Sequence, residues 1–133
     1  MISNFLYVGA GGFIGAVLRY LFYLSFHNIS YKQGFPYATL IVNSLGSLLI
    51  GALLSATIKF NLIDKNSLSS LLVITGILGA FTTFSAFSND NLLFFLNKNY
   101  SMLLLNIFLN NFFGFILVYF GYYSFIKLFN ALS

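Results

Sequence analysis

Several polar side chains that could contact an ion lie within strongly apolar sequence. Asn43 follows Thr39-Leu40-Ile41-Val42 near the beginning of an apolar stretch. A side-chain amide at membrane depth is costly unless it is hydrogen-bonded. Its NH₂ group can donate to an anion without adding a positive charge that would trap the anion. Asn43 therefore either binds a small anion or joins two helices, and taken alone the residue favours the second interpretation.

Two aromatic residues offer a related chemistry. Phe84 and Phe87 are three positions apart and would share one face of a helix. An aromatic ring carries a positive edge, so inward-facing rings could make weak favourable contacts with a small anion. The sequence holds 18 phenylalanines, however, and two of them taken alone are more typical of core or lipid-facing positions.

Three further residues could accompany an anion. Asn106 and Asn110 are four apart, with Gly114 one turn later, so they form a polar stripe on one helix face. The stripe either lines a pathway or forms interhelical hydrogen bonds, and the sequence leaves both open. Arg19, which we expect at the end of the first helix, is the only arginine. It could raise the anion concentration at a pore entrance, or its side chain could extend to the membrane interface.

The segment from Gly76 to Phe87 is unusual for a membrane-spanning helix. Its glycines, its threonine pair and Ser85 suit a lipid-facing continuous helix poorly. Backbone that leaves the helix at membrane depth persists only when it is buried in protein or lines a polar cavity. Membrane proteins use such interruptions to build ion sites from carbonyl oxygens and half-helix ends. We therefore expect the third span to be broken here.

Composition defines the class of protein that must position these residues. The 133-residue chain is 59% hydrophobic and 6% charged, whereas a soluble domain would carry about a quarter charged residues. This indicates an integral membrane protein. The absence of cysteine and a single histidine exclude thiolate and histidine-cluster metal sites, and the scattered basic residues do not suggest a nucleic-acid partner.

Acid–base chemistry is also poorly represented. The only carboxylates are Asp64 in a loop and Asp90 at the end of a span. A proton-coupled exporter would need an ionisable group deep in a span, so active coupling is not expected. No constellation of acid, base and nucleophile is present, which excludes an enzyme.

Four stretches are long enough to cross a bilayer, which takes about 20 apolar residues. They cover about residues 4–26, 37–60, 68–96 and 102–128, and the breaks between them carry polar residues, glycine and the only proline. The chain is thus predicted to be a single four-helix transmembrane domain over residues 1–133. Gly11 with Gly15 and Ser47 with Gly51 have the spacing of close helix packing, within one chain or between subunits.

The basic residues do not favour one orientation. With four spans, both termini and the second loop share one side, and each side holds three basic residues: Lys59, Lys65 and Lys127 against Arg19, Lys32 and Lys98. This balance arises by chance or indicates insertion in both orientations, because orientation follows the excess of lysine and arginine. Four short-looped helices have little room for a pathway, so we expect an oligomer.

Three segments together resemble the fluoride channel family known as Fluc or CrcB. Residues 11–20, Gly-Gly-Phe-Ile-Gly-Ala-Val-Leu-Arg-Tyr, fit its GGxxGAxxRY pattern. Residues 36–46 resemble its GTLxVNxxG segment, with Ala38 in place of a glycine. Residues 76–90 resemble GxxGGxTTFSTF followed by glutamate, with departures at Ala80, Ala86 and Asp90.

The resemblance implies a passive fluoride channel that exports F⁻ down its gradient, built as an antiparallel, dual-topology homodimer in the cell membrane. It also implies a structural Na⁺ at the dimer centre, held by the backbone carbonyls of Gly79 and Thr82. By the same resemblance Asn43 is the pore amide, Phe84 and Phe87 flank the fluoride path, and Arg19 lies in the vestibule. Ser85 would be a nearby hydroxyl without an assigned role.

The fourth span departs from the family. Asn106 and Asn110 stand where the family usually has a tyrosine and the first of several hydroxyl residues. Amides can replace hydroxyl donors, so conduction would survive with a changed rate or selectivity. Two alternatives stay open: one subunit of a heterodimeric fluoride channel, and a non-conducting structural membrane subunit.

Overall fold

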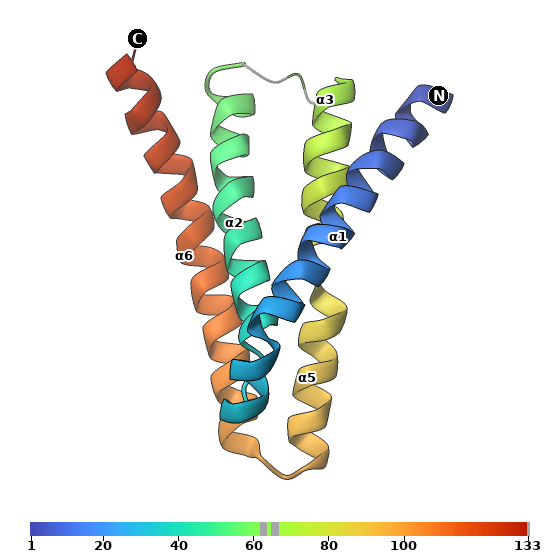
Figure 1. Ribbon diagram of the computed structural model, residues 1–133. Helices are drawn as coiled ribbons and strands as arrows, with labels where there is room; N and C mark the ends of the chain where they lie inside the picture. The colour runs from blue at the N-terminus through green and yellow to red at the C-terminus, as the bar shows by residue number, and fades with distance from the viewer. Residues whose placement is uncertain (62–63, 65–66, 133) are drawn as a thin grey trace.

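The computed structural model describes residues 1–61, 64 and 67–132, and this part of the chain is helical (Figure 1). Lys65, one of the charges counted above, lies outside the described residues. Four helical spans, Ile2–Gln33, Tyr37–Ile58, Leu68–Leu96 and Tyr100–Leu132, are long and apolar enough to cross a membrane. The chain is therefore an all-α, multi-pass membrane protein.

The first two spans meet at a sharp turn. Helix α1 covers Ile2–Gln33 and ends at Gly34, whose φ of 63° is the left-handed conformation that glycine adopts without a Cβ clash. Pro36 then precedes α2, Tyr37–Ile58. The residues after Phe26, which we expected to form a loop, continue α1 as far as Gln33. The helix outlasts its apolar stretch because Gly34 and Pro36, rather than polarity, end it.

The third span consists of four short helical elements. These are α3 (Leu68–Ser70), the π-helix η1 (Leu71–Leu78), α4 (Gly79–Phe81) and α5 (Phe84–Leu96). Thr82 (φ −73°, ψ 157°) and Thr83 (φ −149°, ψ 112°) separate α4 from α5 and have extended backbone. We refer to these two residues as the threonine step. The wider π-helical turn was not expected, and such turns are often found beside functional sites.

The last span is a single helix. A tight turn at Asn97-Lys98-Asn99, with Lys98 at a φ of 56°, connects α5 to α6, Tyr100–Leu132. The start of α1, the ends of α2 and α6 and the start of α3 lie at the same end of the molecule (Figure 1), as four spans require. The turns between α1 and α2 and between α5 and α6 lie at the opposite end.

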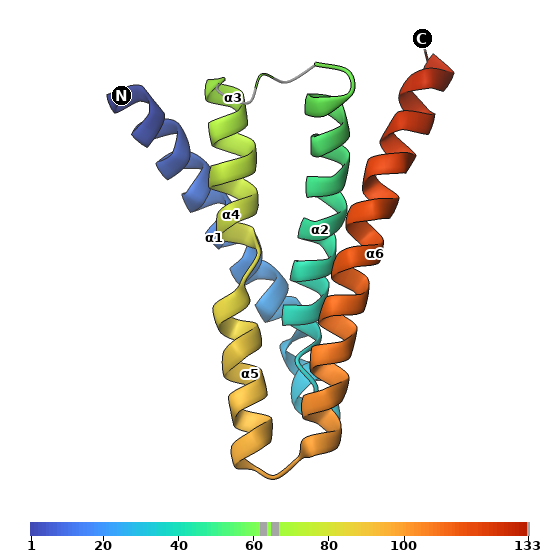
Figure 2. The ribbon, with the colours of Figure 1, turned by 180° about the vertical axis from the view of Figure 1, so that it is seen from behind.

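Close backbone contacts join the helices in two pairs. α1 packs against η1 and α4, and α2 packs along α6. A Cβ at Gly11 or Gly15 would collide with backbone of the third span, and one at Gly51 or Gly121 with backbone across the α2–α6 contact. Gly11, Gly15 and Gly51 thus serve packing within one chain. Figure 2 shows α1 and α6 diverging from the central helices towards the termini.

Candidate functional site

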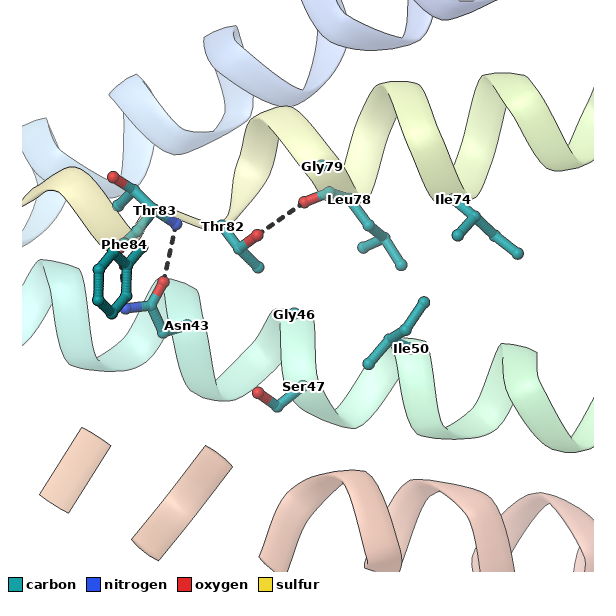
Figure 3. Close-up of a pocket in the computed structure, with 10 residues that line it drawn as sticks. All are labelled: Asn43, Gly46, Ser47, Ile50, Ile74, Leu78, Gly79, Thr82, Thr83 and Phe84. Atoms are coloured by element: carbon teal, nitrogen blue, oxygen red, sulfur yellow. Dashed lines mark hydrogen bonds between the residues drawn. The ribbon is translucent and has the colours of Figure 1, made fainter. Parts of the chain in front are cut away.

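The threonine step is held by one side chain from another helix. The N–H of Thr83 donates to Asn43 Oδ1 at 2.9 Å, and Asn43 Nδ2 donates to the carbonyl oxygen of Thr83 at 3.2 Å (Figure 3). Extended backbone at membrane depth cannot satisfy its own polar groups, and water is absent there. Asn43, on α2, satisfies both groups of Thr83 and replaces the helical partners that this residue lacks.

The hydroxyl group of Thr83 begins the next helix. Thr83 Oγ1 accepts from the N–H of Ala86 at 3.1 Å, the hydrogen bond of a helix N-cap. Thr83 Oγ1 also lies 3.2 Å from Ser85 Oγ. Thr83 is buried, so all of its polar groups contribute to fixing where α5 starts.

The amide of Asn43 continues into a row of asparagines. Asn43 Nδ2 donates to Asn110 Oδ1 at 3.2 Å, Asn110 Nδ2 donates to Asn106 Oδ1 at 2.9 Å, and Asn106 Nδ2 donates to Asn91 Oδ1 at 2.8 Å. We call these four residues the asparagine row. It connects α2, α6 and α5, and Asn106 at its centre is completely buried. The structure therefore unites Asn43, Asn106 and Asn110.

A cavity of about 420 Å³ lies beside the threonine step. Figure 3 shows Asn43 and Thr83 at one end, and the apolar side chains of Ile50, Ile74 and Leu78 at the other. The ring of Phe84 also lines the cavity and is largely exposed, and its centroid lies 5.7 Å from that of Phe87. Asn43, Phe84 and Phe87 are thus close together. The cavity combines a few polar groups with an apolar wall, as ligand pockets generally do.

Arg19 lies in the middle of α1, not at the end of the first helix as we expected, because α1 extends to Gln33. Its Nη1 contacts the carbonyl oxygen of Thr82 at 3.5 Å. Arg19 and Ser85 both line a second cavity of about 580 Å³, together with Asn89. The guanidinium group therefore puts a positive charge beside the threonine step, on the α1 side of the molecule.

A second polar contact joins α1, α2 and α5. Thr39 Oγ1 donates to Asp90 Oδ2 at 2.8 Å and lies 2.9 Å from the hydroxyl oxygen of Tyr23. A threonine hydroxyl has one hydrogen, which here goes to Asp90, so Tyr23 donates to Thr39. Asp90 thus accepts a hydrogen bond from a buried hydroxyl group.

The carbonyl oxygens near the step differ in their surroundings. The N–H of Thr83 would donate to the carbonyl of Gly79 in a continuous helix, but it donates to Asn43 instead. Within residues 1–61, 64 and 67–132, the Gly79 carbonyl has no other hydrogen-bond donor. The Thr82 carbonyl contacts Arg19. An oxygen atom without a donor could serve as a ligand of a cation, and Gly79 offers one.

Sequence reasoning overlooked two residues of this site. Thr83 was read as part of a helix break, without a role for its backbone or hydroxyl group. Asn91 was not considered at all, although an amide at membrane depth needs a partner as much as Asn106 does. Asn91 lies far from Asn106 and Asn110 in the sequence, so residue spacing does not indicate its contact with Asn106. That contact depends on the packing of α5 against α6.

Residues 6–122 match the protein family described as CrcB-like protein, Camphor Resistance (CrcB). A relative from Campylobacter lari is 45% identical over 126 residues, 94% of this chain and 99% of its own length. A relative from Elusimicrobium minutum is 46% identical over 83% of this chain and 83% of its own length. A relative from Clostridium perfringens (strain 13) is 44% identical over 79% of this chain and 80% of its own length. All three are named fluoride-specific ion channel FluC. The chain belongs to the CrcB family.

Proposed function

We propose that this protein is a fluoride-selective channel of the cell membrane that lets F⁻ leave the cell passively and so relieves fluoride toxicity. The observation that carries the proposal is the similarity to fluoride-specific channels over nearly the whole chain, 94% in the Campylobacter lari relative. The threonine step and the residues around it supply the chemistry.

Fluoride is a small anion that holds its water strongly, so a pore must replace that water with donors. The amide of Asn43 is a suitable donor because it is neutral and held at the threonine step. Its hydrogen bond to Asn110, at 3.2 Å, is a contact that a passing anion could replace. Asn110 and Asn106 would then line the continuation of the path, with the NH₂ group of Asn110 directed to Asn106.

The aromatic rings and Arg19 complete the pathway that we propose. The neighbouring rings of Phe84 and Phe87 would offer their weakly positive edges to an anion near Asn43, which favours a small anion without strong binding. The charge of Arg19 would raise the anion concentration in the second cavity, where Ser85 offers a hydroxyl group. Chloride, which is larger, would be excluded mainly by the width of the path.

We also propose that two copies form an antiparallel homodimer around a structural Na⁺. The open cavity beside the threonine step supports this, because a second subunit would close it. The carbonyl of Gly79, which has no donor in the described part of the chain, supports a cation site, whereas the Thr82 carbonyl would have to leave Arg19 to join it. A bound Na⁺ would supply a fixed positive charge at the subunit contact.

Fluoride efflux from liposomes that contain the purified protein tests the function. We expect rapid release of fluoride without a proton gradient and no measurable release of chloride. Flux that requires a proton gradient would replace the channel with a transporter. If fluoride flux appears only when a second, related chain is added, the protein is one subunit of a heterodimer; if no partner restores flux, it is a structural subunit.

A further inference from the structure

The asparagine row has a direction, and the backbone of Thr83 determines it. At the end of the row next to the threonine step, the N–H of Thr83 faces Asn43 Oδ1 and the carbonyl of Thr83 faces Asn43 Nδ2. A backbone N–H can only donate and a carbonyl can only accept. If the Asn43 amide were rotated by half a turn, its NH₂ group would face the N–H of Thr83 and its Oδ1 would face the carbonyl oxygen of Thr83. The amide therefore has one orientation.

The orientation of the Asn43 amide determines the orientation of the other amides in the row. Asn43 Nδ2 donates to Asn110, so the oxygen of Asn110 faces Asn43 and its NH₂ group faces Asn106. The NH₂ group of Asn110 donates to the backbone carbonyl of Asn106 at 3.0 Å and to Asn106 Oδ1 at 2.9 Å. The NH₂ group of Asn106 must then point to Asn91, where it meets Oδ1 at 2.8 Å. Asn110 and Asn106 thus each accept on the side of the threonine step and donate on the far side, and Asn91 accepts from Asn106.

Counting hydrogens shows where unused donors collect. An asparagine NH₂ group has two N–H donors. Asn43 and Asn110 each use both, and Asn106 uses one. Asn91 uses neither with any of residues 1–61, 64 and 67–132, and its side chain is partly accessible. The free donors of the row are thus two on Asn91 and one on Asn106.

We infer that Asn91, held in place by Asn106, forms a second binding position for a small anion at the contact of α5 and α6. The inference rests on the proposed function, because the anion would be the fluoride that the channel carries. Neutral N–H donors would hold such an ion briefly and release it. The carboxylate of the adjacent Asp90 is directed to Thr39 on α2, whereas Asn91 meets Asn106 on α6.

Two substitutions test the donor role: Asn91→Asp removes both unused donors and keeps an acceptor for Asn106, and Asn91→Leu, of similar size, removes the donors without adding a negative charge. If Asn91 binds the anion, fluoride efflux from liposomes should fall about tenfold or more in both variants, the effect of losing a hydrogen bond to a charged group. A loss of efflux in Asn91→Asp alone would come from its charge and would contradict the donor role. Asn111→Asp is the matched control, because Asn111 is exposed on α6 and its Nδ2 donates only to the Ile107 carbonyl.

A binding measurement on the unaltered protein keeps the inference testable if a variant does not fold. The protein is labelled with ¹⁵N-asparagine in lipid nanodiscs and titrated with sodium fluoride, with sodium chloride as the reference. We expect the side-chain NH₂ signals of Asn91 to shift with fluoride and not with chloride.

The two proposals fail in different ways. Wild-type efflux with no loss in Asn91→Asp, and no fluoride-dependent shift at Asn91, would overturn the second binding position and leave the channel intact. A wild-type protein without any fluoride efflux would overturn the channel. The shift at Asn91 would then decide the binding position by itself.

Discussion

At the scale of single residues, Asn43 joins structure and function. Its amide bonds both polar backbone groups of Thr83 and reaches Asn110 with its remaining donor. The residue that would bind the anion thus also supports the interruption beside it. Loss of Asn43 should therefore affect stability and conduction together, whereas loss of a residue that only contacts the anion should affect conduction alone.

Replacing Asn43 with leucine, which has a similar volume, should test this double role. The N–H and carbonyl of Thr83 would lose their partners, and each unsatisfied buried group costs about 1–3 kcal/mol. We expect a clearly lower midpoint of thermal unfolding in detergent and no fluoride efflux. Asn111→Leu, outside the row, should keep both properties. An Asn43→Leu protein with unchanged unfolding would show that its hydrogen bonds to Thr83 contribute little.

The sequence allowed part of this site to be predicted at the residue scale. Asn43, Asn106 and Asn110 stand out because amides are rare in apolar spans, and the structure shows the interhelical hydrogen bonds that were one of their two interpretations. Asn91 could not be placed with them from spacing alone. Its partner comes from another helix, and the contact depends on how α5 and α6 pack.

At the scale of helices, Thr83 marks the start of α5. Replacing it with valine keeps the shape of the side chain but removes the acceptor for the N–H of Ala86. Loss of a threonine cap costs about 1 kcal/mol, so thermal unfolding in detergent should begin at a lower temperature. Thr83→Ser keeps the hydroxyl group and should unfold close to the wild type. Equal unfolding of the valine and serine variants would contradict the capping role.

The contact of α1 with the third span should depend on Gly15. A Cβ there would meet the backbone of Ile77 and Phe81, which cannot move aside as a flexible side chain could. Overpacking of this kind costs about 1–3 kcal/mol, so Gly15→Ala should lower the yield of folded protein and its unfolding temperature. Gly9→Ala is the control on the same helix, because a Cβ at Gly9 meets nothing within 4 Å. Similar behaviour of the two variants would place the stabilising contact elsewhere.

The sequence predicts helices more reliably than their ends and their local geometry. The four apolar stretches correspond to the four spans because apolar length is a direct requirement of the bilayer. Residues 27–33 were misread, since a helix can continue past its apolar part until Gly34 ends it. The π-helical turns of η1 left no signal, because they depend on packing against α1 rather than on residue type.

At the scale of the whole molecule, the charge distribution supports insertion in both orientations. From the order of the four spans in the sequence, Lys59, Lys65 and Lys127 are expected on the side of the termini, and Lys32 and Lys98 on the opposite side. Arg19 contacts the Thr82 carbonyl part-way along α1, so it does not count as a loop charge. A difference of one lysine is too small to fix one orientation, because orientation follows a clear excess of lysine and arginine near the span ends.

Added charges should therefore control which way the protein inserts. Asn97→Arg with Ser101→Arg would hold the turn between α5 and α6 in the cytoplasm, and Ser3→Arg with Asn130→Arg would hold the termini there. If the active form is an antiparallel pair, each double variant alone should lose fluoride resistance in cells, and expressing both together should restore it. Glutamine at the same four positions is the control for the substitutions themselves. Full resistance from either arginine variant alone would exclude the antiparallel dimer, because all of its copies would face the same way.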